Sequence, residues 1–342
     1  MIVELLTPLV IATAPIRVDV PEVAYNHEQQ VSVSLASNQT TGWNTLNGTQ
    51  TFDWNSIDGT SDLVLKKLGT KAFRLNCDLF SEYTFCLSPD GWSIENPTGH
   101  KITSDTATAL WWWKAFNYTA HDEPFINEEL KYIFRELLNW ARSRDMLKAN
   151  PPDFHNRLGK IGILSVAKKY FAIPSTTITW GFTSPPPITN AVAKSLASGL
   201  TTTNKALFTT AVDTQRLDPK FPWYLQEKIN ASADTTILIV GKHKFCFDRD
   251  RSGLTGLDWR NEQDFTCIKE EWIPQELSQD QDAAVNAFCE EIGVSWGRLD
   301  LLRLEDGSLV FLEYNANGQW VFLDYHNKYG LVDTVIDYLT TT

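Results

Sequence analysis

The sequence predicts an α/β protein of two or three lobes with an oxygen-rich hairpin near its C-terminus. Its 342 residues are more than one simple hydrophobic core holds. Some segments repeat apolar residues with helical spacing, and others are short apolar runs typical of strands, which together indicate a mixed fold. In the late segment 296–320, two apolar runs flank Asp306-Gly307, a pair that strongly favours a hairpin turn.

The composition argues against several classes of protein. Hydrophobic residues make up 43% and charged residues 21%, which is ordinary for a soluble globular chain. The net charge of −12, without a run of Lys or Arg, argues against a nucleic-acid partner. No apolar run approaches the ~20 residues of a membrane span, and residues 1–14 lack the basic start of a signal peptide. The five cysteines have no CxxC spacing, so neither a disulfide framework nor a zinc site is indicated. We expect a cytoplasmic protein.

The first 57 residues give few structural signals. Residues 31–35 alternate apolar and polar side chains as a strand does. Residues 38–55 are rich in Thr, Asn, Gly and Gln, which is typical of a loop or flexible linker. We therefore interpret residues 1–57 as an N-terminal extension.

An α/β unit is predicted next. Residues 61–68 form an amphipathic helix with Gly69 as its C-cap, and residues 71–75 form a strand. The run Trp111-Trp112-Trp113 lies on a further strand. Because neighbouring side chains of a strand face opposite sides, we expect at least one of these tryptophans to be exposed or covered by a partner. Burial in the core is the alternative.

A longer helix is predicted over residues 127–147, where apolar residues repeat at i, i+3 and i+4. Asn127 with Glu128 or Glu129 gives the acidic first turn that a helix dipole favours. Asn150-Pro151-Pro152 then interrupts the chain and marks a domain boundary.

Strands and helices alternate through the remaining residues. Lys194 lies on an apolar strand, where a solvated charge is unexpected, so it is a candidate for binding an anion. A plain surface lysine is the alternative. The predicted strands cover 173–179, 191–195, 222–229 and 234–241, and the predicted helices cover 279–292, capped by Gly293, and 332–339.

The late hairpin carries a candidate metal site. Glu313 and Asn315 share one face of the returning strand 309–315, and the turn can bring Asp300 across to meet them. Two carboxylates and an amide oxygen suit a hard cation such as Mg²⁺. The alternative is a solvated acidic face. The strands are otherwise strongly apolar, however, and buried acids need a partner or a metal.

The pattern D-L-L…D-G…V-F-L-E-Y-N-A-N-G-Q-W in this hairpin resembles the metal-binding end of ATP-grasp ligases. It is most similar to the ATP-grasp maturases of ribosomal peptides, the graspetide synthetases, which the NGQW tail separates from small-molecule ATP-grasp ligases. The resemblance covers residues 58–342. It implies an ATP-grasp fold with an N-terminal α/β pre-ATP-grasp domain.

The resemblance also implies where the domains lie. The pre-ATP-grasp domain would cover residues 58–149, the central nucleotide lobe 150–224, and the C-terminal lobe with the metal site 225–342. Residues 26–33 resemble the tail of some precursor peptides. The extension 1–57 is therefore either extra structure packed on the enzyme or a leader-like segment joined to it.

The resemblance assigns roles to residues. Lys160 and Lys194 would contact the phosphates of ATP. The strand end Gln226, Glu227, Lys228 and Ile229 would face adenine, with the backbone of 227–229 reading the base and the Glu227 carboxylate taking a base amine or a ribose hydroxyl. The implied ligands of Mg²⁺ are Asp300, Glu313 and Asn315.

Asp258-Trp259-Arg260 matches the family's DWR signature. Arg260 would hold the acceptor carboxylate or the developing acyl-phosphate, and Asp258 would accept a proton from the attacking hydroxyl or amine. A structural Asp–Arg pair is the alternative. Many relatives carry D-x-R at the start of the strand 234–241, where Thr236 replaces the arginine, so a substrate-binding role for that strand is in doubt.

The implied activity is that of an ATP-dependent peptide macrocyclase. Such an ADP-forming ligase activates Asp or Glu side chains of a ribosomal precursor peptide, with its leader and core, and joins them to Ser or Thr hydroxyls or Lys amines as ω-esters or ω-amides. Two alternatives stay open: a small-molecule carboxylate–amine ligase of the same fold, and a non-catalytic peptide-binding module. Homo-oligomers are common for this resemblance, although nothing in the sequence demands one.

Overall fold

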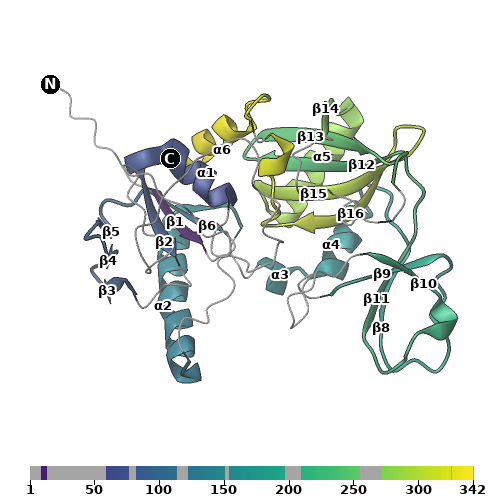
Figure 1. Cartoon of the computed structure of the whole chain (residues 1–342), viewed down its shortest axis with the longest axis horizontal. Helices are drawn as coiled ribbons and strands as arrows, with labels where there is room; N and C mark the ends of the chain where they lie inside the picture. Colours follow the sequence, from purple (N-terminus) through teal and green to yellow (C-terminus); the bar gives the residue numbers. More distant parts are fainter. Residues whose placement is uncertain are drawn as a thin grey trace.

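The computed structural model describes residues 9–13, 59–76, 82–113, 122–150, 154–196, 209–254, 257, 272–324 and 326–341. These residues form three units that follow one another along the chain (Figure 1). Each unit is built around its own sheet. The predicted mixed α/β architecture is confirmed.

The N-terminal unit has a sheet in the order β2-β1-β6-β7, and its strands pair in parallel. Its central strand β1 lies within the segment that the sequence assigns to an extension, so at least these five residues belong to the sheet. A small antiparallel sheet, β3-β4-β5, stands beside it. The strands are β1 (Leu9–Thr13), β2 (Ala72–Asn76), β3 (Thr84–Ser88), β4 (Gly91–Glu95), β5 (Lys101–Thr103), β6 (Ala109–Trp113) and β7 (Leu147–Lys148).

Two helices cover the parallel sheet. Helix α1 (Gly59–Leu68), followed by the 3-10 turn Gly69–Lys71, confirms the first predicted helix. Helix α2 (Pro124–Ser143) differs from the predicted range 127–147 at both ends. It begins earlier because Pro124 occupies the first turn and the Glu123 carboxylate caps the Phe125 N–H. It ends earlier because the chain turns at Asp145, with a positive φ, and enters β7.

The central lobe is an antiparallel sheet in the order β10-β9-β11-β8. In Figure 1 it lies below the C-terminal sheet, and helix α4 (Lys160–Ala167) lies between them. The short helix α3 (Phe154–Arg157) leads into α4, and the lobe also holds a 3-10 turn at Thr214–Arg216. The strands are β8 (Thr176–Thr179), β9 (Ala191–Lys194), β10 (Thr210–Val212) and β11 (Trp223–Glu227).

The C-terminal unit is an antiparallel sheet in the order β14-β13-β12-β15-β16. Helix α5 (Gln279–Ile292) matches the predicted range, with Ser278 and Gln281 forming a capping box and Gly293 ending the helix at φ 68°. A 3-10 turn at Val321–Leu323 precedes the closing helix α6 (Leu331–Thr340). The strands are β12 (Ala233–Val240), β13 (His243–Asp250), β14 (Ile273–Gln275), β15 (Trp296–Arg303) and β16 (Leu309–Asn315).

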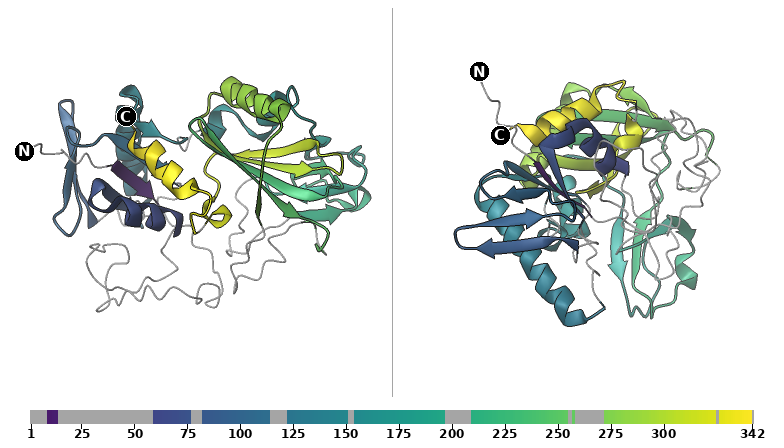
Figure 2. Two further views of the ribbon diagram at one scale, coloured as in Figure 1. Left: turned by 90° about the horizontal axis from the view of Figure 1, so that it is seen from above. Right: turned by 60° about the vertical axis from the view of Figure 1, so that its left-hand side comes forward.

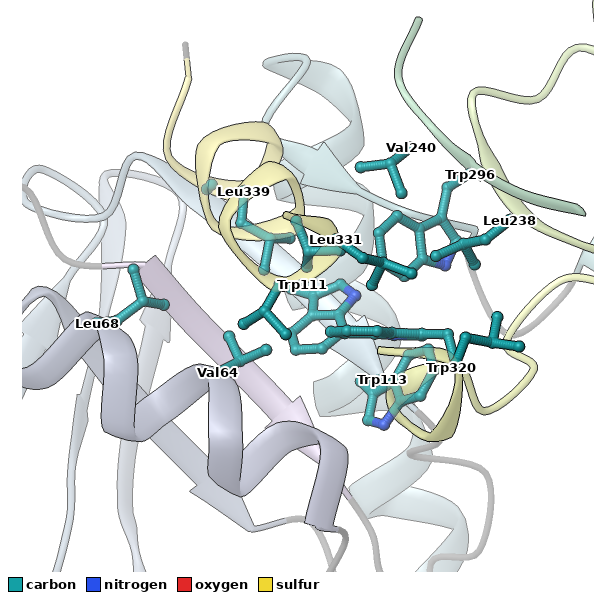
Figure 3. Packing of buried hydrophobic residues seen from close by; sticks show 14 of the residues in the cluster. Val64, Leu68, Trp111, Trp113, Leu238, Val240, Trp296, Trp320, Leu331 and Leu339 are labelled. Carbon is teal, nitrogen blue, oxygen red and sulfur yellow. The ribbon is translucent and has the colours of Figure 1, made fainter. Parts of the chain in front are cut away.

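The tryptophan run joins the N-terminal and C-terminal units. Trp111, Trp112 and Trp113 are all fully buried, so the expectation that one is exposed is wrong and the core alternative is confirmed. Trp112 packs in the core beneath α2. Trp111 and Trp113 face the other way, with ring centroids 6.0 and 6.2 Å from Trp296 on β15 (Figure 3). The C-terminal sheet, together with α1 and α6, covers this face from within the chain.

Helix α6 closes this junction. It contacts α1 and β6 on one side and β12 on the other. Seen from above, it lies between the N-terminal parallel sheet and the C-terminal sheet (Figure 2). The end of the chain thus ties the N-terminal unit to the sheet that carries the late hairpin.

Candidate active site

A cleft of about 760 Å³ lies between the central-lobe sheet and the C-terminal sheet. Strands β8, β9 and β11 line one wall, and β12, β15 and β16 line the other. Every predicted site residue that the structure describes lines this one cleft, although these residues are up to 155 positions apart: Lys160, Lys194, Gln226, Glu227, Lys228, Ile229, Asp300, Glu313 and Asn315.

Two predicted catalytic residues cannot be placed. Asp258 and Arg260 lie outside the described residues. The neighbouring Leu257 does line the cleft, and its carbonyl accepts a hydrogen bond of 3.2 Å from the Arg251 guanidinium.

The hairpin β15–β16 brings the acids together. Asp300 stands directly opposite Glu313, and Arg298 stands opposite Asn315, so all four side chains share one face. The register shifts just after Asp300, because β16 has one extra residue at this point, Leu312, which also lines the cleft. Two carboxylates and an amide oxygen thus converge at the cleft wall.

Burial raises the pKa of Asp300, and the nearby Glu313 carboxylate raises it further, while Arg298 acts in the opposite direction. Arg298 Nε lies 2.9 Å from Asp300 Oδ1, and Nη2 donates to Oδ2 at 3.0 Å. Thr236 Oγ1 donates to the same Oδ1 at 3.2 Å. Asp300 is therefore an acid held in place by an ion pair with Arg298, which contributes one hydrogen bond, and by the Thr236 hydroxyl.

Sequence reasoning missed Arg298. Its signal was a charged residue two positions before Asp300 in an otherwise apolar strand. Thr236 stands where many members of the resembled family carry the arginine of D-x-R. Its hydroxyl lies beside Asp300, and Arg298 on the neighbouring strand β15 pairs with the same carboxylate. Arg298 Nη1 also donates to the Gln319 carbonyl at 2.7 Å, in the segment after β16.

The donor set fits a hard cation. Across the described ranges, no group of three or more His, Cys, Asp or Glu side chains could hold a metal. Asp300, Glu313 and Asn315 instead offer two carboxylates and one amide oxygen on adjacent hairpin positions, which is the oxygen chemistry of Mg²⁺ rather than that of zinc.

The two lysines approach from the central lobe. Lys160, the first residue of α4, places Nζ 3.9 Å from Glu313 Oε2 and donates to the Ser195 carbonyl at 3.1 Å. Its Nζ also lies 5.6 Å from the centre of the Tyr224 ring. Lys194 on β9 stands opposite Tyr224 on β11. The pKa of Tyr224 is raised by burial and by the Glu313 carboxylate. Cations and carboxylates thus face each other across the cleft, as binding of a polyanion together with a metal requires.

The end of β11 has fewer backbone N–H groups available to a ligand than the sequence suggests. The Glu227 N–H donates to the Ser175 carbonyl at 2.8 Å, and the Lys228 N–H donates to the Asn190 carbonyl at 2.9 Å. These two backbone donors are used inside the protein, so any backbone contact to a ligand falls to the carbonyls and to Ile229. Gln226 is buried, and its side chain is one of the cleft's lining groups.

Arg251 is a second cleft residue that the sequence did not reveal. Its Nη1 donates to Asp234 Oδ1 at 2.5 Å, and both side chains line the cleft. No short motif marks this arginine, because β12 and β13 bring it beside Asp234 only through their hairpin register.

In the ranges that the structure describes, no helix is both long and apolar enough to span a membrane.

No protein-family model matches the chain, and a search of curated proteins finds no match. Solved structures do resemble it. An ATP-grasp ligase associated with RiPPs from Chryseobacterium gregarium, in complex with ADP and a leader and core peptide, superposes with a TM-score of 0.68 at 20% identity and covers 97% of this chain and 96% of its own. Macrocyclase MdnC from Microcystis aeruginosa, bound with precursor peptide MdnA, gives 0.67 at 18% identity over 98% and 100%.

A third structure extends the likeness to a complex with a metal. The ATP-grasp ligase PsnB, complexed with a phosphomimetic variant of a minimal precursor, Mg and ADP, gives a TM-score of 0.60 at 14% identity over 97% of this chain and 98% of its own. All three alignments span nearly the whole of both chains. The chain therefore has the ATP-grasp fold, as its C-terminal hairpin predicted.

Proposed function

We propose that this protein is an ATP-dependent peptide macrocyclase. It activates carboxylate side chains of a ribosomal precursor peptide and joins them to Ser or Thr hydroxyls or Lys amines. The observation that carries the proposal is the meeting of both halves of the expected machinery in one cleft. Lys160 of the central lobe lies 3.9 Å from Glu313 of the hairpin, and Asp300 stands opposite Glu313.

ATP and Mg²⁺ are the proposed cofactors. Asp300, Glu313 and Asn315 would hold the cation, and Lys160 and Lys194 the phosphates. Mg²⁺ neutralises the charge that develops on a phosphoryl group during transfer. The lysines add point charges from the opposite wall, and the sheet pairing on both sides holds these groups in position before substrate arrives.

The proposed reaction has two steps. An oxygen of the peptide carboxylate bonds to the γ-phosphorus while the bond to the β-phosphate oxygen breaks, which releases ADP. The hydroxyl or amine then attacks the activated carbonyl carbon, phosphate leaves, and the attacking group gives up its proton. Asp258 is the proposed acceptor of this proton, and Arg260 the proposed partner of the developing oxyanion. The protein contributes mainly position and charge.

The precursor peptide is the proposed partner. The three similar structures are each described as complexes with a precursor or with a leader and core peptide. Their alignments cover nearly all of this chain, which supports a peptide as the partner here. The domain limit near residue 150 and a cytoplasmic location belong to the same proposal. The limits at 58 and 225 are revised, because β1 (Leu9–Thr13) pairs within the N-terminal sheet and β11 (Trp223–Glu227) pairs within the central-lobe sheet.

Mass spectrometry of the peptide tests this function. The protein would be incubated with Mg²⁺, ATP and the precursor peptide encoded beside its gene. We expect the peptide to lose the mass of one or more waters. Glu313→Ala should abolish this loss, because it removes a cation ligand and the partner of Lys160. Glu305→Ala is the matched control, since Glu305 is exposed in the turn of the same hairpin.

Other outcomes would redirect the assignment. An unchanged peptide mass with ADP released would point to a different carboxylate substrate, such as a small molecule. No ADP with any peptide would favour a binding module. Equal activity in both variants would show that Glu313 is not part of the active site.

A further inference from the structure

Gly318 lies directly against the side chain of Asn315, one of the three proposed cation ligands. A Cβ atom added to Gly318 would lie 2.9 Å from Asn315 Cγ, 3.1 Å from its Nδ2 and 3.2 Å from its Cβ. Carbon atoms in contact prefer a separation of about 3.5–4.0 Å, so the first of these distances is a clash. Of the twenty amino acids, only glycine therefore leaves the Asn315 amide where the structure places it.

The backbone conformation at Gly318 does not itself require glycine. Its φ lies outside the left-handed range, unlike that of Gly297 on β15, which is 136°. Other residues adopt such a backbone without strain. The reason for a glycine at position 318 is therefore its close approach to Asn315.

The main chain around Gly318 is held on both sides. The Gly318 N–H donates to the Asn315 carbonyl at 3.3 Å. The next carbonyl, that of Gln319, accepts a hydrogen bond of 2.7 Å from Arg298 Nη1. Trp320 is fully buried in the interface with the N-terminal unit. Because these contacts oppose a retreat of the main chain, a side chain at position 318 would displace the Asn315 amide instead.

A displacement of this amide changes the cleft wall. Asn315 lines the cleft and stands on the hairpin face that also carries Asp300 and Glu313. Relieving the clash requires a movement of about half an ångström, which is the tolerance of about 0.5 Å within which binding groups must be held. Residues that orient the ligands of a metal typically contribute about 10–100-fold to its affinity.

We propose that Gly318 is a positioning residue of the cation site, because its missing side chain leaves room for the Asn315 amide in the orientation that binds Mg²⁺. The inference rests on the proposed ATP- and Mg²⁺-dependent function. It assigns a part in cation binding to a residue that has no side-chain ligand atom of its own.

Calorimetric titration of Mg²⁺ into the protein saturated with ADP, without peptide, tests the proposal. Gly318→Ala should weaken Mg²⁺ binding about tenfold or more, while the affinity for ADP without metal stays nearly unchanged. Gly253→Ala is the matched control, because Gly253 is exposed and no described atom lies within 4 Å of its added Cβ. The φ of Gly253 also lies outside the left-handed range, so this variant should bind Mg²⁺ as the wild type does.

A double-mutant cycle with Asn315→Ala distinguishes positioning from a general structural role. Asn315→Ala removes Cγ and Nδ2, the two atoms that lie nearest to the added Cβ. In that background Gly318→Ala should not weaken Mg²⁺ binding further, because the displaced amide is gone. The melting temperature without ligands gives a second readout. Gly318→Ala should lower it less in the Asn315→Ala background than in the wild type.

The outcomes separate this inference from the function on which it rests. If the wild-type protein binds neither ADP nor Mg²⁺, the ATP-dependent function fails and the inference fails with it. If the wild type binds both and Gly318→Ala binds Mg²⁺ equally well, the function stands and the role of Gly318 is wrong. The same conclusion follows if Gly318→Ala weakens Mg²⁺ binding by the same factor with and without the Asn315 amide.

Discussion

One face of the C-terminal sheet is apolar at one end, here called the dry end, and polar at the other, here called the polar end. Along β15 this face carries Trp296, then Arg298, then Asp300, and along the antiparallel neighbour β12 it carries Leu238 and then Thr236. The Trp296 end packs against the tryptophans of β6 (Figure 3), and the Asp300 end forms the cleft wall. Two residues along one strand separate the interface between units from the candidate active site.

The two ends differ in the partners of their buried polar groups. In the dry end, the indole N–H groups of Trp111 and Trp320 are buried without a hydrogen-bond partner among the described residues. In the polar end, the Asp300 carboxylate accepts hydrogen bonds from Arg298 Nη2 and from Thr236, although Arg298 Nε has no hydrogen-bond partner among the described residues. The dry end gains from the burial of large rings, despite the unsatisfied donors, whereas the polar end accepts desolvated charge. Stability and chemistry therefore occupy neighbouring parts of a single surface.

Trp296→Ala should produce the largest loss of stability. Its ring contacts Trp111, Trp113 and Trp320 and is 1% exposed, so truncation should lower the free energy of unfolding by about 3–5 kcal/mol. Trp180→Ala is the matched control, because Trp180 is 72% exposed and its loss should change stability by about 0.5 kcal/mol or less. Urea denaturation measures both. Equal effects would contradict the dry-end assignment.

Asn150→Ala tests the connection between the two ends. The buried Asn150 Nδ2 donates to the Trp296 carbonyl at 2.7 Å and to the Tyr314 hydroxyl at 2.6 Å. Tyr314 stands between Glu313 and Asn315, so Asn150 ties the interface strand to the acidic strand. The same nitrogen also lies 3.2 Å from the Ala316 carbonyl, whereas the Trp296 carbonyl keeps the hydrogen bond from the Tyr314 hydroxyl. Loss of the Asn150 bonds should cost about 1–3 kcal/mol, which is less than Trp296→Ala.

Asn150→Ala should also weaken Mg-nucleotide binding, because the hairpin loses its support behind the acids. Denaturation and nucleotide titration measure the two effects separately. A stability loss with unchanged nucleotide affinity would show that the ends are independent.

The sequence predicts best those features that are encoded locally. The helix from Gln279 to Ile292 is matched at both ends, because its cap residues and Gly293 stand beside it in the chain. The hairpin is also predicted, because Asp306-Gly307 sets the turn and the alternation sets the facing residues. The direct pairing of Asp300 with Glu313 needs in addition the extra residue Leu312, which neither signal predicts, because the register nearer the turn would place Asp300 opposite Leu312.

Features that depend on distant partners are not predictable from the sequence in this way. Strand β1 is defined by its pairing with β2 and β6 on either side, a contact that no local signal in residues 1–57 marks. The burial of Trp111 and Trp113 requires the C-terminal sheet, whose Trp296 is more than 180 residues away. Arg251 enters the cleft only through the register of β12 with β13. In each case the determining contact is tertiary, and local propensity carries no trace of it.

Asp300→Asn should have the smallest effect on stability, and of the opposite sign. The pKa of Asp300 is raised by burial even with Arg298 beside it, so the fold disfavours the ionised carboxylate. A raised carboxyl pKa means that the folded state holds its proton more tightly than the unfolded state. The cost is absent below the usual carboxyl pKa of about 4 and develops as pH rises through the raised value. At neutral pH, Asp300→Asn should therefore be at least as stable as the wild type, while nucleotide binding with Mg²⁺ is lost.

Asp248→Asn is the comparison for this prediction. Asp248 is also buried beside an arginine, with Arg303 Nε 2.6 Å away, but it serves no ligand in our proposal. Breaking that pair should lower stability by about 3 kcal/mol. The stability difference between Asp300→Asn and the wild type, followed by denaturation from pH 4 to 8, should grow with pH. A loss of stability in Asp300→Asn similar to that in Asp248→Asn would mean that Arg298 and Asp300 form a structural pair, and the polar end would then hold the fold together in the same way as the dry end.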